Sequence, residues 1–342
     1  STQFEARDWV PHSGWPISRS EIDPYYIRAH DLCELGDFDY GPENWKTLKI
    51  SEPEFNPAKV VTRFWKYSPP TRFGPKYAPE LKGADNLIVY LNASVIDIGT
   101  SGDTKTVQQV DVRSLGGKTG KVSAKVFVLA CGGLDNPRML LSSNRIEPHG
   151  LGNRHDLVGR FFMEHLSAVP QDIVATDTTK LVRMFAKSRQ GNTPVHAGLC
   201  PSDQSQRENK ILSSSMSIES VVDMNSGVGT AKSLVLDLKD GRMPDDLASK
   251  VWRVLSDLDE VIPASYRRTV MGEPLVAGIK SMFLMSRSEQ APNPDSRVTL
   301  SNEKDALGMN RVQLDWRLTD LDKHTLRVFS RTLASELGRL DL

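Results

Sequence analysis

Residues 125–141 constrain the fold more than any other part of the chain, because they read as a strand, a glycine turn and a helix. The apolar run 126–130 has the length and β-branched content of a strand buried on both faces, as in a parallel sheet. Gly132 and Gly133 follow this run. Asn136 is a favoured N-cap and Pro137 suits a first helical position, so a helix is predicted to begin near Arg138.

The glycine turn has two interpretations. Glycines allow a backbone to approach a ligand closely, and a helix N-terminus attracts an anion through its free N–H groups. The alternative is a tight strand-to-helix turn that binds nothing. Local features favour this second reading, because the full dinucleotide pattern G-x-G-x-x-G is absent.

Composition excludes several classes of protein. The chain has 342 residues, and its 43 Lys plus Arg balance its 43 Asp plus Glu. A balanced charge recruits neither nucleic acid nor an anionic membrane surface, and no apolar stretch reaches the roughly 20 residues of a membrane span. Cys33, Cys131 and Cys200 lie far apart without metal-ligand spacing, which argues against a disulfide framework and against a zinc site. A soluble protein is expected, with the cytoplasm and the periplasm both left open.

The first 150 residues are predicted to form a mixed lobe. A helix should begin at Asp23-Pro24 and end at Gly36, and residues 41–79 should form a long surface excursion. Residues 87–91 and 95–98 are predicted to form a strand with an interruption. Val110 and Val112 alternate with polar residues before a glycine turn at 116–120, which predicts a meander that leads into the buried run.

After residue 150 the pattern changes to short strands with one helical stretch near 244–258. Strand candidates fall at 168–175, 181–185, 213–218, 278–285, 297–300 and 311–314. Many strands with few helices predict an antiparallel sheet covered on one side. A last helix opens at Thr319-x-x-Asp322, and its apolar stripe should face a core; the stripe is formed by Leu326, Phe329, Leu333 and Leu337.

Six segments occur in an order that resembles one enzyme family. They are W-V-P-H-S-G-W-P (9–16), S-P-P-T-R-F-G (68–74), N-L-I-V-Y-L-N-A-S-V (86–95), L-A-C-G-G-L-D-N-P-R (129–138), L-V-G-R-F-F-M-E-H (157–165) and E-Q-A-P-N-P-D-S-R-V (289–298). Together they look like the glucose-methanol-choline (GMC) oxidoreductases, flavoenzymes that oxidise alcohols. The resemblance spans nearly the whole chain and is weakest over 176–278.

The resemblance implies an α/β (α+β) fold in three parts. Residues 1–155 would form a partial FAD-binding, Rossmann-like domain with the surface excursion, and 156–318 an antiparallel-sheet substrate-binding domain. Residues 319–342 would be a truncated helix that returns towards the FAD domain. Because the family's glycine fingerprint and its catalytic His segment are not found here, we expect an internal fragment of a longer flavoenzyme, inactive alone, with its catalytic residues outside the chain.

The same resemblance assigns cofactor contacts to five residues. The main chain of Val95 would meet the adenine of FAD, while Ala130, Cys131, Gly132 and Gly133 would lie near its ribose and pyrophosphate. Cys131 follows the predicted buried strand without a partner thiol or an activating base nearby in sequence, so it is interpreted as a buried structural thiol.

Other polar and aromatic residues have structural readings beside functional ones. Glu164-His165 stands where the family commonly has Asp-His, and His165 is interpreted as a structural hydrogen-bonding residue rather than an acid–base group. If the segment is helical, Asp156, Arg160 and Glu164 would form an i, i+4 charge ladder. Four aromatic residues could form either a substrate-channel wall or plain core: Trp9, Trp15, Trp65 and Phe73. Three charged residues are predicted to form ion pairs: Glu289, Arg297 and Arg317.

The function expected from the resemblance is FAD-dependent oxidation of a CH–OH group in an alcohol, polyol or sugar, with hydride passing to flavin N5. Two alternatives stay open. A non-catalytic interaction module on the same fold would explain the lack of catalytic residues, and a nicotinamide-dependent dehydrogenase would require the complete glycine fingerprint. The partner is then a small-molecule substrate, and the electron acceptor is left open between oxygen, a quinone and a cytochrome.

Overall fold

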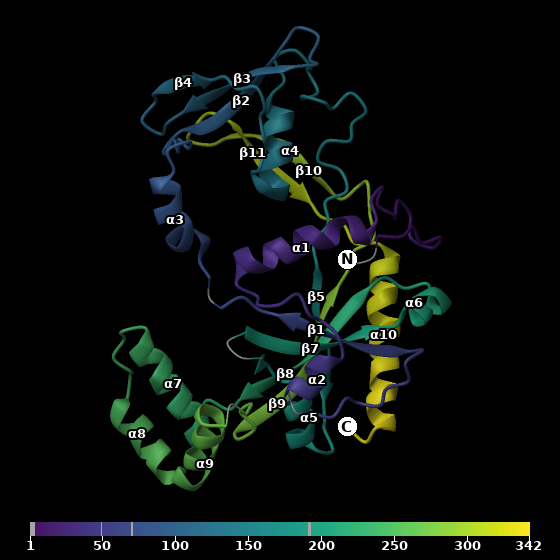
Figure 1. The fold of residues 1–342 in the computed structure, drawn as a ribbon, viewed down its shortest axis with the longest axis vertical. Helices are drawn as coiled ribbons and strands as arrows, with labels where there is room; N and C mark the ends of the chain where they lie inside the picture. The colour runs from purple at the N-terminus through teal and green to yellow at the C-terminus, as the bar shows by residue number, and fades with distance from the viewer. Residues whose placement is uncertain (1–3, 49, 70, 191–192, 272) are drawn as a thin grey trace. The chain divides into compact units, whose positions relative to one another are not determined.

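The computed structural model describes residues 4–48, 50–69, 71–190, 193–271 and 273–342 of the chain, which divides into two compact units (Figure 1). Unit 1 comprises Ser1–Arg72, His165–Glu289 and Asp320–Leu342, and unit 2 comprises Phe73–Glu164 and Gln290–Thr319. The mixture of helices with antiparallel sheets confirms the predicted α+β class. The predicted boundaries at 155 and 318 lie close to two of the crossings, but the chain also crosses between units after 72 and after 289.

Unit 1 is built on one large antiparallel sheet, which confirms the sheet predicted for the second half of the chain. Its strands run in the order β1 (Val60–Lys66), β7 (Thr193–Pro201), β8 (Ser214–Val222), β9 (Ile279–Ser288) and β5 (Leu166–Ile173), and β6 (Ser188–Gln190) pairs with β7 (Figure 1). Every pairing is antiparallel. β1 lies within the predicted surface excursion, so this segment supplies a strand rather than irregular chain.

One face of this sheet carries the main core. Helix α10 (Asp320–Arg339) contacts β5, β9, β1 and β8, while α5 (Thr178–Phe185) contacts β7 and β8. Phe329, Leu333 and Leu337 are buried, so the predicted apolar stripe of the last helix faces a core as expected. Glu336 is buried beside this stripe, where its carboxylate accepts the Asn56 N–H at 3.0 Å and lies 3.2 Å from Lys59 Nζ. The last helix is therefore bonded to the segment that precedes β1.

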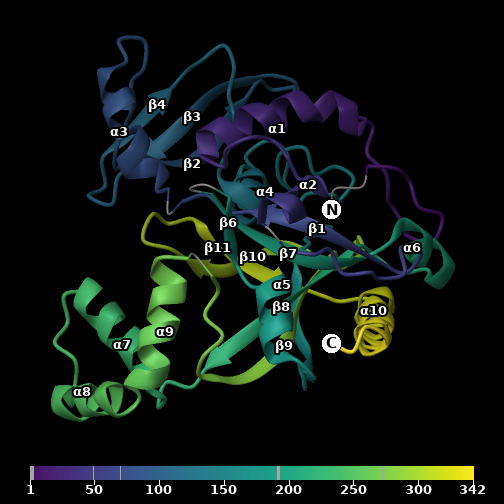
Figure 2. The same cartoon turned by 60° about the horizontal axis from the view of Figure 1, so that its bottom comes forward.

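The remaining helices of unit 1 are α1 (Arg19–Cys33), α2 (Glu43–Leu48), α6 (Asp203–Asn209), α7 (Gly227–Lys239), α8 (Leu247–Ser256) and α9 (Leu258–Thr269). Of these, α2 carries Trp45 and adds this buried side chain to the main core. A capping box between Ser18 and Glu21 begins α1 at Arg19, earlier than the predicted start at Asp23-Pro24. Helices α7–α9 group together (Figure 2) around a small cluster of Val228, Val261 and Ala264.

Unit 2 combines a meander, a hairpin and a central helix. The meander β2 (Ser94–Thr100), β3 (Val107–Arg113) and β4 (Thr119–Val122) confirms the prediction around Val110 and Val112. Strands β10 (Arg297–Lys304) and β11 (Asn310–Asp315) form the hairpin, and α3 (Phe73–Gly83) precedes the meander in the chain. Helix α4 (Gly132–Ser142) packs against β2, β10 and β11, and Arg138 on it pairs with Asp305 at 2.5 Å.

Two predicted strands of unit 2 are wrong. Residues 126–130 and 87–91 have no regular structure, and the side chains of Val126 and Val128 are 78% and 85% exposed. A strand needs a neighbouring strand for its backbone hydrogen bonds, and no described strand pairs with either segment. The helix after the glycine turn is confirmed but begins at Gly132 instead of near Arg138.

The strand predicted at 181–185 is also wrong, because these residues end helix α5. Asp177 caps this helix by accepting the N–H of Lys180 at 2.9 Å. Leu181, Val182 and Phe185 are fully or almost fully buried, a spacing that places them on one side of a helix. A five-residue apolar run does not distinguish a strand from a buried helical turn, and here the cap decides between them.

Candidate functional site

The five predicted cofactor residues lie on two neighbouring elements of unit 2. Val95 is half-buried near the start of β2, opposite Val112 of β3, and β2 packs against α4. Ala130 ends the exposed apolar segment, while Cys131 occupies the N-cap position of α4 and Gly132 and Gly133 begin the helix. Their roles in cofactor binding stay predictions.

The N-terminus of α4 is open to approach from outside the protein. Gly132 has φ +85°, a conformation that favours glycine, and a Cβ at Gly132 or Gly133 would meet no heavy atom of the protein within 4 Å. The Cys131 N–H donates to Oδ1 of Asn136 at 2.8 Å, which fixes the entry to the helix. Because the first N–H groups of a helix lack intrahelical partners and carry partial positive charge, an anion is stabilised at such an end.

Cys131 does not have the predicted environment. Its side chain is exposed, as are those of Val126 and Val128 before it, so the prediction of a buried structural thiol is wrong. The reason is the same as for the missing strand at 126–130, since no neighbouring strand covers this segment among the described residues. Cys200 is the buried thiol of the chain: it contacts Ser215 Oγ at 3.3 Å, and burial raises its pKa.

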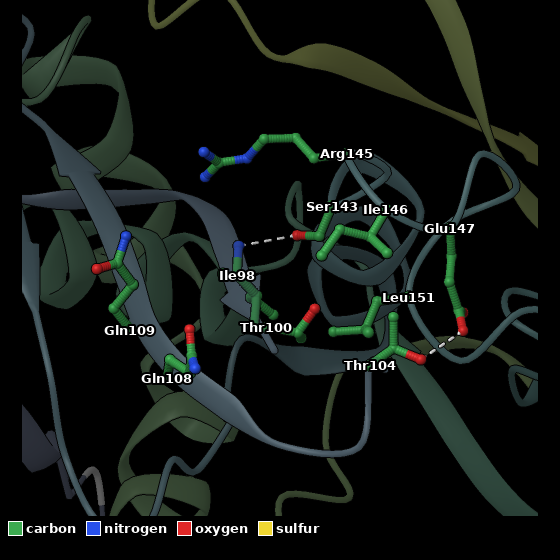
Figure 3. A pocket seen from close by; sticks show the side chains of 11 residues that line it. Ile98, Thr100, Thr104, Gln108, Gln109, Ser143, Arg145, Ile146, Glu147 and Leu151 are labelled. Carbon is green, nitrogen blue, oxygen red and sulfur yellow. Dashed lines mark hydrogen bonds between the residues drawn. The ribbon is translucent and has the colours of Figure 1, made fainter. Parts of the chain in front are cut away.

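A pocket of about 240 Å³ lies at the other end of α4, against the β2–β3 hairpin (Figure 3). Ser143 Oγ accepts the N–H of Ile98 at 3.0 Å there, and Thr104 donates to Glu147 at 2.8 Å. The Glu147 carboxylate also accepts from Arg154 at 2.8 Å, and the bonds to Thr104 and Arg154 lower its pKa.

The other charge of this pocket is paired as well. Arg145 bonds to both Asp97 and Asp111, with 2.6 Å to Asp111. The pocket is also smaller than the roughly 300–1,000 Å³ of most small-molecule sites. These contacts join the hairpin to the end of α4, so we assign the pocket a structural role.

In unit 1, the face of the sheet opposite the main core carries an aromatic and polar cluster. Trp65 and His196 are cross-strand partners on β1 and β7, with ring centroids 5.6 Å apart at 78°. Tyr67 stacks beside His196 with centroids 6.5 Å apart, and its hydroxyl lies 3.4 Å from His196 Nδ1. Lys187 Nζ lies 4.6 Å from the centre of the Tyr67 ring, within cation–π distance.

Gly198 makes room for this cluster. A Cβ at this position would lie 2.7 Å from the Trp65 ring and 2.9 Å from Ser215 Oγ, so only glycine lets the indole cross the strand here. On the next strand, Ser217 donates to the half-buried Glu219 at 2.8 Å. We define the sheet-face cluster as Trp65, Tyr67, Lys187, His196, Ser215, Ser217 and Glu219.

His196 is the titratable centre of the sheet-face cluster. The residue is 2% exposed, and burial is the largest cause that lowers its pKa. The Glu219 carboxylate and the Phe185 carbonyl oppose this shift, but the carbonyl does not reach Nε2 with hydrogen-bond geometry. A buried, neutral imidazole has one donor and one acceptor nitrogen, so it can orient a hydroxyl group. Sequence reasoning missed His196 because no strand was predicted over 193–201, so its cross-strand partner on β1 could not be foreseen.

The other aromatic candidates and His165 lie outside the sheet-face cluster. Trp9 donates its indole N–H to the Ile211 carbonyl at 2.9 Å, Trp15 is exposed, and Phe73 is exposed in unit 2. Of the four predicted aromatic wall residues, Trp65 alone belongs to the sheet-face cluster. His165 is exposed and directly precedes β5 in unit 1.

The charged candidates form ion pairs, as predicted. Glu289 pairs with Arg7 at 2.7 Å, Arg297 with Asp156 at 2.8 Å, and Arg317 with Asp315 at 2.6 Å. Asp156 also pairs with Arg160, although the segment is not helical, and bonds to Arg297 and Arg160 lower the Asp156 pKa to about 2. Glu164 donates its backbone N–H to Oε1 of Gln290 at 3.1 Å.

Across the described ranges, no group of three or more His, Cys, Asp or Glu side chains is arranged to hold a metal ion. Nor does this part of the chain contain a helix long and apolar enough to cross a membrane.

Comparison with known proteins gives two partial similarities, and no family model matches the chain. Over 216 residues the chain is 29% identical to the fructose dehydrogenase large subunit of Gluconobacter japonicus, which covers 48% of this chain and 39% of that protein. Over 68 residues it is 35% identical to the 2-methyl-1,2-propanediol dehydrogenase of Mycolicibacterium austroafricanum, covering 20% of this chain and 12% of that protein. The chain thus spans less than half the length of each relative. Both relatives are named as dehydrogenases, so the matched stretches are similar to oxidoreductases.

Proposed function

We propose that this chain is part of an FAD-dependent oxidoreductase that acts on the CH–OH group of an alcohol, polyol or sugar. The observation that carries the proposal is the uncovered start of α4, where two successive glycines present bare backbone and helix N–H groups. The similarity to two dehydrogenases, one of a sugar and one of a diol by name, supports the same reaction class.

The residues at the start of α4 fit the pyrophosphate of a dinucleotide. Gly132 and Gly133 place no side chain over the helix end, so a phosphate oxygen could reach their N–H groups. Val95 lies on β2, and β2 pairs with β3 on one edge only among the described strands of its sheet. A strand edge offers main-chain donors and acceptors of the kind that adenine requires.

When bound, FAD would supply the redox chemistry by accepting hydride at N5. The large sheet would supply substrate contacts through its sheet-face cluster. The rings of Trp65 and Tyr67 offer apolar surfaces for the C–H faces of a sugar or alcohol, while His196 and Glu219 offer hydrogen-bonding groups. The catalytic base is assigned to none of the residues of this chain.

The test is the absorbance spectrum of the purified full-length protein, followed by anaerobic addition of sugars, polyols and aliphatic alcohols. We expect flavin bands in the visible region and bleaching by at least one compound of the panel. A protein that binds no FAD, even after reconstitution, would refute the proposal. FAD that is bound but bleached by no compound would favour the interaction module, and NAD(P)⁺ reduction without flavin would favour a nicotinamide dehydrogenase.

A further inference from the structure

A cavity of about 640 Å³ lies within unit 1, where the end of β8 meets helices α7 and α9. This volume falls in the range of roughly 300–1,000 Å³ that is typical of small-molecule sites. The cavity is lined mainly by segments over which the sequence shows no recognisable motif. Figure 2 shows these helices beside the ends of β8 and β9.

The lining is mostly apolar. Ile218 and Val222 of β8, Val228 and Leu236 of α7, and Leu275 contribute aliphatic side chains. Ile218 and Val228 are buried, whereas Leu236 is 48% exposed, so the apolar surface runs from the core towards solvent. Such a surface gains about 25 cal/mol for each Å² that a ligand removes from water.

The charges that line the cavity are predominantly positive. Lys187, Lys232, Lys239 and Arg268 face one carboxylate, that of Glu219. Across the described residues none of these three lysines forms an ion pair with a carboxylate, and Arg268 donates to the Glu273 carbonyl at 3.5 Å. Four cations against one anion favour an anionic group near the cavity mouth.

A buried polar group lies at the inner end. His196 lines the cavity while being 2% exposed, and its Nε2 has no hydrogen-bond partner among the described residues. A buried polar atom without a partner is costly, so Nε2 is a polar position in an otherwise largely apolar wall. An apolar lining, a basic rim and an unsatisfied buried nitrogen thus occur in one cavity.

We propose that this cavity binds an amphipathic organic anion, a carboxylate carried on an apolar chain or ring. The apolar part would lie against α7, α9 and the end of β8, while the carboxylate would bond to Lys232 and Arg268. The cavity shares Lys187, His196 and Glu219 with the sheet-face cluster, so a bound anion would occupy part of the proposed substrate surface. Its test concerns binding alone and requires neither flavin nor turnover.

The experiment is titration calorimetry of the purified protein with octanoate, octanamide and acetate. We expect saturable octanoate binding at one site, octanamide weaker by about tenfold or more because bonds to a charged group are the stronger ones, and no saturable acetate binding. Equal binding of octanoate and octanamide, or no octanoate binding, would overturn the proposal without any variant.

Variants locate the site. Lys232→Ala with Arg268→Ala should weaken octanoate by about tenfold or more, whereas the matched pair Lys82→Ala with Lys118→Ala, two exposed lysines of unit 2, should not change it. Ala231→Phe should abolish binding by filling the cavity, with folding checked by circular dichroism. If the Lys232→Ala, Arg268→Ala variant binds octanoate as tightly as the unmodified protein, the anion binds elsewhere and the proposal is overturned. The proposal is also overturned if the control pair weakens octanoate binding as much as this variant does.

Discussion

Replacing Gly133 by Ala tests whether the fold or a bound ligand requires glycine at this position. Gly133 lies in the first turn of α4, its φ is not positive, and an added Cβ would meet no protein atom within 4 Å. The substitution therefore strains neither the backbone nor the packing. If FAD lies over this helix end, the same methyl group would stand where a phosphate oxygen approaches the backbone.

The expected effects have opposite signs. In a helix, Ala is more favourable than Gly by up to about 1 kcal/mol, so the free energy of unfolding should stay constant or rise slightly. FAD affinity should fall by about tenfold or more, which corresponds to roughly 1.4 kcal/mol of lost binding free energy. Gly132→Ala differs, because φ +85° imposes a strain of about 1–3 kcal/mol on any side chain whether or not a ligand is bound.

The assay is urea unfolding of the apoprotein together with FAD titration followed by flavin fluorescence. Gly338→Ala is the matched control, since this exposed glycine also lies in a helix, α10, with nothing within 4 Å of an added Cβ. The control should gain similar stability and keep its FAD affinity. If Gly133→Ala binds FAD as tightly as the unmodified protein does, the cofactor does not pass over this helix end.

Three further predictions test the environments of single side chains. In the native protein a thiol reagent should modify the exposed Cys131 quickly and the buried Cys200 only on unfolding. Cys131→Ala should remove the fast phase and retain flavin, and a fast reaction of Cys200 would contradict its burial. Burial lowers the His196 pKa below 6.5, so protonation of His196 favours the unfolded state. The contribution of His196 to the free energy of unfolding should therefore be constant above about pH 6.5 and fall below it. In urea unfolding at pH 7.5 and 5.5, His196→Gln should reduce that fall. Phe329→Ala should cost about 3–5 kcal/mol of unfolding free energy and the exposed Phe73→Ala close to nothing, so equal losses would refute the assigned core.

Local patterns predicted the elements whose partners are close in sequence. The meander around Val110 and Val112 formed because each strand pairs with the next across a short turn. The last helix was predictable because its apolar residues repeat with helical spacing and it has a clear start. In both cases the signal and the stabilising contact lie within the same short stretch of chain.

The predictions failed where a distant partner decides the structure. The apolar run 126–130 has a strand's composition, but β-strand geometry needs an adjacent strand to accept its backbone hydrogen bonds, and the described residues provide none. Conversely, β1 lacked a clear period, yet it pairs along its whole length with β7, about 130 residues later. Pairing at such a separation cannot be read from a local window.

The same distinction applies to the candidate sites. The start of α4 lies at the glycine pair that the sequence singled out, although the expected cap Asn136 and Pro137 lie inside the helix. The sheet-face cluster was not found, because its members come from separate strands. His196 contacts Trp65 through the pairing of β1 with β7, and it interacts electrostatically with Glu219 on the neighbouring strand β8. A surface assembled across strands has no contiguous sequence signature and must be read from the sheet, whereas the proposed cofactor contacts follow from a local motif.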